Sequence, residues 1–404
     1  MSCARFLALL FTFGQAIAFA QSAELNGRIT DSSGSVLPGV KLAVTNSATE
    51  AVRDASTNDL GYYTVLRLQP GAYSLKAEKQ GFRGIVETSI NLEVDQRATV
   101  EFTMVVGDLA QEVSVKAIAP LLDTVEPSIG QVIDNRQIVS LPLNGRDYAQ
   151  LALLSSGTTN PIAGSRAGGF SSGGQRLSAN NYLLDGVDNN SLELADAGRS
   201  AELVKPSVDA IQEFKVQTNV YSAEYGHGTG AVVNVTIKSG TNAIHAAVFE
   251  FLRNEKVDAR NFFSSPTAPA PEFRRNQYGF AVGGPVIKNK TFLFGDWEGT
   301  KIRQQQTTLS SLPTSAERTG DFGALSKKVT DPTTGLVFAN NVIPSSRFDP
   351  VAQTLINLYP ATQNSGLISN YLYNGPNNED VTRFDVRCSR ISAEPQELEL
   401  KLSA

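Results

Sequence analysis

The chain has 404 residues, a formal net charge of −5 at pH 7, and only two cysteines and two histidines. The weak negative charge argues against a nucleic-acid partner, because proteins that bind nucleic acid carry a surplus of positive charge on the binding surface. Two cysteines exclude a disulfide framework. No apolar run after the first 20 residues reaches the ~20 residues of a spanning helix. The same observation does not exclude a transmembrane β-barrel, because its strands give a weaker sequence signal than a spanning helix.

The first 20 residues predict export. Arg5 precedes an apolar run, and Ala18-Phe19-Ala20 places small residues where a signal peptidase cleaves. We therefore expect a cleaved secretory signal. A membrane anchor is the alternative, which is disfavoured because the apolar run is short. Cys3 leaves with the signal, so Cys388 would have no cysteine partner in the mature chain.

Residues 24–106 predict a small β-sandwich. Val40, Leu42 and Val44 alternate with Lys41, Ala43 and Thr45, and turn residues such as Pro70-Gly71 recur along the segment. Short strands separated by turns at about ten-residue spacing are typical of a sandwich. The residues that follow, 107–127, are expected to be a connector with one β-prone piece at 112–115.

From residue 128 onward the pattern mixes helix and strand. We expect helical pieces at 134–141, with Asp134 as N-cap, and at 148–154 and 207–214, a mobile Gly/Ser-rich loop at 157–175, and strands at 181–184, 214–218 and 231–238. Beyond residue 240, aromatic-rich strands are predicted at 247–253, 277–282 and 291–297. On pattern alone, an outer-membrane barrel and a soluble β-domain stay equally open for this last part.

The order of the motifs resembles a known family. Gly27-Arg-Ile-Thr-Asp31 and Leu68-Gln-Pro-Gly-Ala-Tyr73 resemble the carboxypeptidase-regulatory-like module, a transthyretin-like sandwich. Leu141-Pro-Leu-Asn-Gly-Arg146 and Tyr182-Leu-Leu-Asp-Gly-Val-Asp188 are similar to the plug of a TonB-dependent receptor. Gly283-Gly-Pro-Val-Ile287 is similar to the first barrel strands of the Oar-like subgroup.

The resemblance implies a mainly β fold: a transthyretin-like β-sandwich, an α+β plug, and the first strands of an incomplete transmembrane β-barrel. The expected divisions are a signal peptide (1–20), the sandwich (24–106), a linker (107–127), the plug (128–240), barrel strands (241–387) and an aberrant tail (388–404).

The resemblance also implies a function: a TonB-dependent outer-membrane receptor or transporter that takes up a scarce solute, with the sandwich in the periplasm. The implied partners are TonB with its inner-membrane motor, outer-membrane lipid, and an unknown small solute or oligosaccharide. The resemblance does not distinguish an oligosaccharide from a siderophore or a peptide as the solute. The alternative is a secreted carbohydrate-binding or adhesive β-protein that uses the sandwich.

Two groups of residues are candidates for that function. Residues that form an extended piece before the plug are candidates for strand pairing with TonB, with a plain interdomain strand as the alternative: Glu112, Val113, Ser114, Val115, Lys116 and Ala117. Residues of the plug motifs form the second group: Asn144, Gly145, Arg146, Asp185, Gly186 and Asp188. In the family arrangement, Arg136 and Arg146 would pair with barrel carboxylates; a solvated surface is the alternative.

The barrel portion is short for such a receptor. The residues after 240 suffice for perhaps a quarter to a third of about 22 strands. We therefore expect the chain alone to be truncated and incompetent for transport. Because residues 388–404 lack strand alternation, the expectation is a frameshift or truncation near Arg387.

Catalytic, metal and cofactor sites are not expected. His227 and His245 are far apart and lie near no cluster with ligand spacing. The oxygen-rich run at 185–190 lacks the spacing of a calcium-binding loop, so a turn is favoured. The Gly/Ser loop lacks the Lys-Ser/Thr of a phosphate-binding loop. An enzyme is accordingly the least favoured class.

Overall fold

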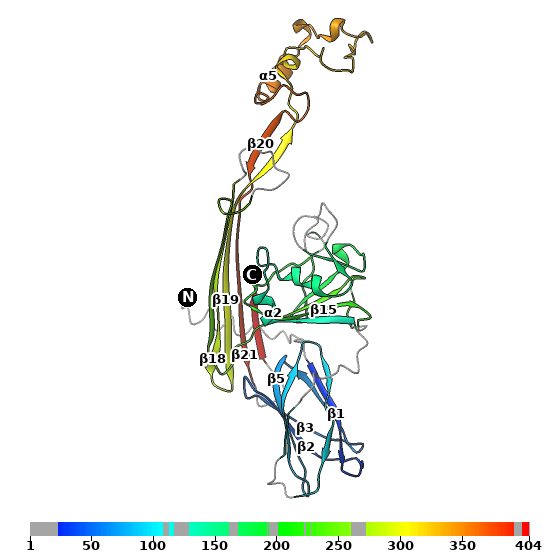
Figure 1. Ribbon diagram of the computed structural model, residues 1–404, viewed down its shortest axis with the longest axis vertical. Coiled ribbons are helices and arrows are strands. Elements are labelled where there is room, and N and C mark those ends of the chain that lie inside the picture. Colours follow the sequence, from blue (N-terminus) through cyan, green and yellow to red (C-terminus); the bar gives the residue numbers. More distant parts are fainter. Residues whose placement is uncertain are drawn as a thin grey trace, which may run out of the picture. The chain divides into compact units, whose positions relative to one another are not determined.

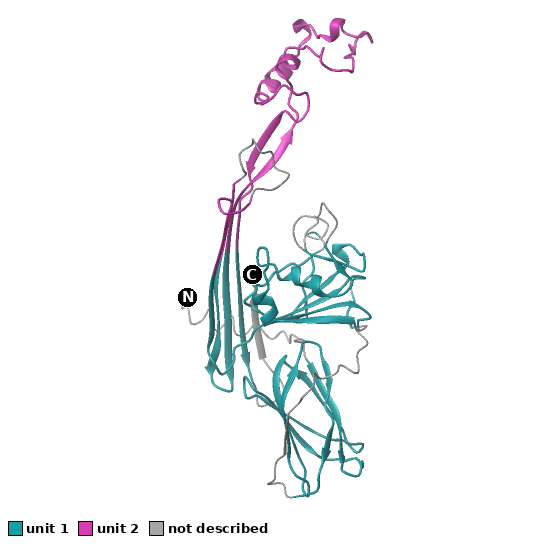
Figure 2. Cartoon of the chain, viewed as in Figure 1, with its two compact units in different colours: residues 1–249, 278–299, 382–404 teal, residues 250–277, 300–381 magenta. Residues whose placement is uncertain are grey.

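Strands dominate the chain, as the sequence predicted (Figure 1). The computed structural model describes residues 23–107, 113–116, 129–160, 169–191, 193, 201–221, 224–226, 228–259, 272–391 and 398–403. The predicted signal peptide, most of the connector, Glu112, Ala117 and His227 lie outside these ranges. The chain divides into two compact units: residues 1–249, 278–299 and 382–404 form the first, and residues 250–277 and 300–381 form the second (Figure 2).

The N-terminal part of the first unit is a sandwich of two sheets, termed here the N-terminal sandwich. One sheet has the order β4-β1-β7, with β8 also paired to β1, and the other has the order β3-β2-β5-β6-β9. The strands are β1 (Ala23–Asp31), β2 (Lys41–Asn46), β3 (Val52–Ser56), β4 (Tyr62–Leu68), β5 (Gly71–Glu78), β6 (Ile85–Leu92), β7 (Arg97–Thr99), β8 (Phe102–Met104) and β9 (Val113–Lys116). Alternate apolar residues such as Leu42 and Leu75 are buried between the sheets, as the period-two pattern predicts.

In the N-terminal sandwich, the backbone of β1 closely approaches the backbone at Val100. The hydroxyl of Tyr63 donates a hydrogen bond to the carbonyl oxygen of Val100 at 2.7 Å. A Cβ at Gly27 would lie 1.8 Å from the same oxygen. Only glycine therefore fits at this position of β1.

Gly27→Ala is expected to lower the free energy of unfolding of the sandwich by about 1–3 kcal/mol, because the backbone around Val100 must move. Chemical denaturation of the full chain, followed by hydrogen exchange of sandwich peptides, measures the change. Val52→Ala is the control, since Val52 is 51% exposed on β3. Equal effects of the two substitutions would contradict this interpretation.

The middle of the first unit, termed here the plug region, is a sheet with short helices. The sheet order is β10-β15-β16-β13-β14, in which β13 and β16 run parallel. The elements are β10 (Ile129–Asp134), α2 (Asn135–Ser140), η1 (Tyr148–Leu154), β11 (Thr158–Thr159), β12 (Ser171–Ser172), η2 (Leu177–Ala179), β13 (Asn181–Leu184), β14 (Val187–Asp188), β15 (Ile211–Asn219) and β16 (Val232–Ile237). One face of the sheet is apolar and packs on the helices, with Tyr148 edge-to-face on Phe214 at 5.2 Å.

Local signals explain the ends of these elements. Asp134 caps α2 in a capping box with Gln137, and the helix ends before Pro142, as expected. The predicted helix at 207–214 is wrong, because Ser207–Ala210 forms a turn and β15 begins at Ile211. Four of the residues predicted as part of a mobile loop instead form short strands, because Thr158 and Thr159 of β11 pair with Ser171 and Ser172 of β12.

The last part of the chain forms a six-stranded sheet, termed here the C-terminal sheet. Its order is β17-β18-β19-β21-β22, with β20 paired to β19. The strands are β17 (His245–Asn254), β18 (Phe273–Ile287), β19 (Thr291–Ser310), β20 (Tyr371–Pro376), β21 (Glu379–Arg390) and β22 (Leu398–Ser403). Part of the segment 388–404, which was predicted to be an aberrant tail without strand alternation, forms strands: β21 continues to Arg390 and pairs with β22.

The second unit contains the segment between β19 and β20. Its short helices are α4 (Ser315–Arg318), η3 (Ala339–Asn341), η4 (Ser345–Arg347) and α5 (Pro350–Asn357). The guanidinium of Arg347 binds both carboxylate oxygens of Asp331, at 2.9 and 3.0 Å. This hydrogen-bonded pair, with help from Thr333, holds the pKa of Asp331 below its usual value. In the part of the chain that is described, no helix combines the length and apolar character needed to cross a membrane.

Alternation along β19 gives the C-terminal sheet two different faces. Phe292, Phe294, Asp296 and Glu298 are buried, whereas Leu293 between them is exposed. Neighbouring β18 adds Phe280 and Val282 to the exposed side, and the Phe280 and Trp297 rings lie 6.3 Å apart. The buried face therefore carries both aromatic and acidic side chains, whereas the exposed face is apolar. An outward-facing apolar, aromatic face is the pattern of outer-membrane barrel strands.

Candidate functional site around Arg146

The loop between α2 and η1 holds Arg146 in a fixed turn. Gly145 and Arg146 both have positive φ, at 82° and 52°, which is uncommon for arginine. The side-chain amide of Gln150 donates to the carbonyl of Asn144 at 2.9 Å, and Asp147 caps η1 by accepting from Ala149 at 3.1 Å. The loop geometry is therefore fixed on both sides of the arginine.

Arg146 connects the plug region to the C-terminal sheet. Its guanidinium pairs with Asp209 of the plug region and with Glu298 Oε2 of β19, the latter at 3.4 Å. The same guanidinium stacks over the Phe249 ring at 4.1 Å. Glu298, whose side chain is 1% exposed, also accepts from Arg383 Nη1 of β21 at 3.0 Å. One buried carboxylate thus binds two arginines from different elements.

A second ionic contact lies at the end of β16. Asp185 and Gly186 form the tight turn between β13 and β14, with φ of 49° and 79°, the conformation that an Asp-Gly hairpin favours. The Asp185 carboxylate accepts from the backbone N–H of Ile237 at 3.1 Å and lies 3.7 Å from Arg387 of β21. Arg387 also donates to the carbonyl of Ile237. The turn therefore binds both its own sheet and the C-terminal sheet.

A further polar contact and a half-buried lysine lie at the interface. Ser207 donates to Asp296 of β19 at 2.6 Å, and both side chains are buried. Burial lowers the pKa of Lys238, while Asp209 and Asp296 oppose that shift. The interface therefore combines charges and hydrogen bonds with a small apolar cluster, made of Ala210, Ile237, Ala281 and Phe294.

Such an interface can separate more readily than an apolar core. Desolvation offsets much of the Coulomb attraction in a buried ion pair, so the pair adds little net stability, although removing one partner is costly. Water can solvate each charged group once the surfaces part.

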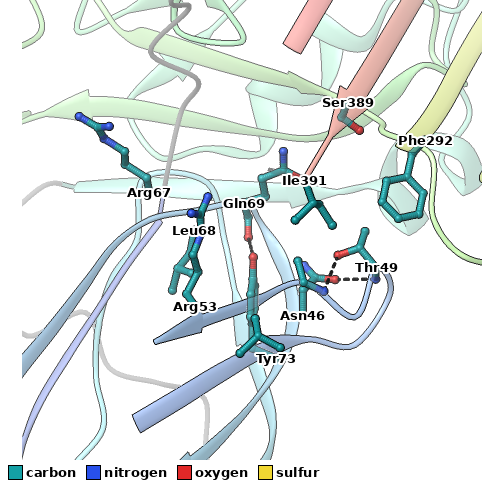
Figure 3. Close-up of a pocket in the computed structure, with 12 residues that line it drawn as sticks. Asn46, Thr49, Arg53, Arg67, Leu68, Gln69, Tyr73, Phe292, Ser389 and Ile391 are labelled. Carbon is teal, nitrogen blue, oxygen red and sulfur yellow. Dashed lines mark hydrogen bonds between the residues drawn. The ribbon is translucent and has the colours of Figure 1, made fainter. Parts of the chain in front are cut away.

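The cavities next to this interface are small. One of about 50 Å³ is lined by residues of the sandwich and the C-terminal sheet, including Asn46, Tyr73, Phe292 and Ser389 (Figure 3). A second, of about 280 Å³, is lined by Asp185 and Arg387 among others. Both are below the ~300 Å³ at which small-molecule pockets usually begin.

The structure does not bring all the predicted site residues together. Arg146 and Asp185 both contact the C-terminal sheet, whereas Arg136, Asn144, Gly186 and Asp188 are exposed. Residues 113–116 form β9, which pairs in parallel with β6 at the end of its sheet. The described residues contain no group of three or more His, Cys, Asp or Glu side chains that could hold a metal.

Most residues of this ionic cluster were not predicted from the sequence. They are Asp209 and Glu298, which contact Arg146, and Arg383, which contacts Glu298. A signal existed for Glu298: it continues the period-two series of Phe292, Phe294 and Asp296, so the pattern places an acidic side chain on the same face as the buried aromatics.

Comparison with known proteins identifies the class of these domains. Residues 236–394 match the outer membrane beta barrel domain, and residues 24–105 match the carboxypeptidase regulatory-like domain. The mainly β fold, the sandwich and the outer-membrane location predicted from sequence are therefore confirmed.

Individual relatives are more specific. The chain is 26% identical over 325 residues to the TonB-dependent transporter Oar of Myxococcus xanthus, covering 78% of this chain and 30% of that protein. It is 30% identical over 115 residues to the probable TonB-dependent siderophore receptor PirA of Acinetobacter baumannii, covering 28% and 14%. These matches confirm the resemblance to Oar-like TonB-dependent receptors, of whose length the chain spans less than a third.

A solved structure also aligns with the chain. The outer membrane transporter YddB from Escherichia coli gives a TM-score of 0.43 at 11% identity, over 68% of this chain and 32% of that one.

Proposed function

We propose that this chain acts in TonB-dependent uptake of a solute across the outer membrane, and that it is a receptor component without catalytic activity. The observation that supports this most is Glu298, a buried carboxylate of β19 that binds Arg146 of the plug region and Arg383 of β21. A plug held by charges can be pulled or rearranged without exposing a large apolar core.

The relatives support the same proposal. The two curated proteins are named as a TonB-dependent transporter and a probable TonB-dependent siderophore receptor. We propose TonB with its inner-membrane motor, outer-membrane lipid and a small solute or oligosaccharide as the partners of this chain.

We propose residues 112–117 as the segment that pairs with TonB. Within this segment, β9 is the terminal strand of its sheet, next to β6. A terminal strand offers backbone N–H and C=O groups along its other edge, and such an edge can accept a further strand. TonB could therefore add to β9 without displacing it from the sandwich.

Replacing Val113 and Val115 by proline is expected to weaken TonB binding about tenfold, because two backbone donors are lost and proline disrupts strand pairing. Binding of the purified full chain to the periplasmic domain of TonB measures the effect. The matched control is Val113→Thr with Val115→Thr, which keeps both N–H groups and the β propensity. Undiminished binding of the proline variant would refute residues 112–117 as the contact segment.

A further inference from the structure

The second face of the plug sheet carries polar side chains, although it is buried. Glu213, Lys215 and Gln217 alternate along β15 with Phe214 and Val216, which belong to the apolar core on the opposite face. The polar side chains are at most 8% exposed. Buried polar groups need hydrogen-bond partners. The segment that covers this face must therefore supply some of them.

The turn between β6 and β7 of the N-terminal sandwich covers part of it. The backbone N–H of Val94 donates to the Glu213 carboxylate. Lys215 Nζ donates to the carbonyl of Asp95 at 3.1 Å, and the side-chain amide of Asn234 donates to the Asp95 carboxylate. The Val94 side chain is completely buried. Three polar contacts and one apolar side chain therefore join the two parts.

We propose that the polar face of the plug sheet is a docking surface for the β6–β7 turn, and that the turn acts as a charged latch which releases the sandwich from the plug region. This inference does not depend on TonB coupling or on solute uptake.

The balance of energies indicates that the latch is reversible. Docking removes the charges of Glu213, Lys215 and Asp95 from water, and this desolvation offsets much of what their contacts contribute. Among the described residues, neither amide atom of the fully buried Gln217 has a hydrogen-bond partner. When the turn leaves, water can solvate the polar groups of Glu213, Lys215 and Asn234 that it had contacted. A permanent interface would instead have an apolar centre.

The latch should also respond to pH. Burial raises the pKa of Glu213 from its usual 4.5 to about 7, with the Val94 N–H opposing the rise and Glu93, Asp134 and Asp95 adding to it. Burial also raises the pKa of Asp95, opposed by Asn234, Tyr225 and Lys215 and reinforced by Glu224. A pKa raised by docking means that docking is favoured by protonation. The latch is therefore tightest below pH ~4.5 and loosens as pH rises to about 7.

Hydrogen exchange of the full chain in detergent micelles tests the docking. Lys215→Ala with Asn234→Ala is expected to raise the opening-limited exchange of the β6–β7 turn about tenfold, since two hydrogen bonds are lost. Exchange within β1 and β2 should not change, which shows that the sandwich stays folded. Unchanged exchange of the turn in this variant would overturn the proposal.

The pH dependence gives a second test with a more conservative variant. Protection of the turn, corrected for the intrinsic exchange rate, is expected to fall up to about tenfold per pH unit at its steepest between pH 5 and pH 7. Glu213→Gln keeps an acceptor for the Val94 N–H but cannot titrate, so its pH dependence should be markedly flatter. Asp54→Asn, at an exposed position on β3, should behave as wild type. A wild-type pH profile in Glu213→Gln would overturn the role of Glu213 in the latch.

Discussion

Glu298→Ala is expected to lower the free energy of unfolding of the plug region by about 3–5 kcal/mol, because it leaves two arginines at a buried interface without their shared carboxylate. The two are Arg146 of the plug region and Arg383 of β21. Denaturant titration of the full chain in detergent, with hydrogen exchange of plug peptides as the readout, measures the loss.

A double-mutant cycle isolates the Arg146–Glu298 pair. Combining Glu298→Ala with Arg146→Met should cost less than the sum of the single substitutions, because the contact between Arg146 and Glu298 can be lost only once. Glu250→Ala is the matched control, since Glu250 is an exposed carboxylate on β17. Additive effects in the cycle would show that the pair is not energetically coupled.

The second large effect is expected at the apolar face of the plug sheet. Phe214→Ala should lower the free energy of unfolding of the plug region by about 3–5 kcal/mol, because it removes a fully buried ring. That ring packs edge-to-face on Tyr148, which is also buried. Val139→Ala on α2 is the control, because Val139 is 50% exposed. A cost below ~1 kcal/mol for Phe214→Ala, measured by the same titration, would show that the apolar face is not the core of the plug region.

Local patterns predicted the elements whose signals are local. The alternation of Val40, Leu42 and Val44 reflects one buried face of the sandwich, and the Asp134 cap fixes the start of α2. The 207–214 segment was predicted as a helix, whereas its second half begins β15, in which polar and apolar residues alternate on opposite faces. There, Glu213 and Lys215 are buried against another part of the chain, and burial of this kind has no local signature.

Long-range contacts could be predicted only from the resemblance. Arg146 was singled out by its motif, but its partner Glu298 is 152 positions away, and no spacing rule connects them. The lengths of β18 and β19 were also underestimated. Their apolar cores are short, and polar residues such as Gln304 and Gln305 continue β19 because the neighbouring strands supply the hydrogen bonds.

The central proposal is that the chain is an outer-membrane receptor component with its N-terminal sandwich in the periplasm, and we propose that the segment between β19 and β20 lies on the opposite, outer side of the membrane. Single cysteines at Asp54 in the sandwich and at Val351 in α5, both exposed positions, test it in intact cells in a background with Cys3 and Cys388 replaced by serine. A membrane-impermeant maleimide should label the Val351 position directly, and the Asp54 position only after the outer membrane is permeabilised. Labelling of the Asp54 position in intact cells, or recovery of the chain outside the outer-membrane fraction, would contradict the account.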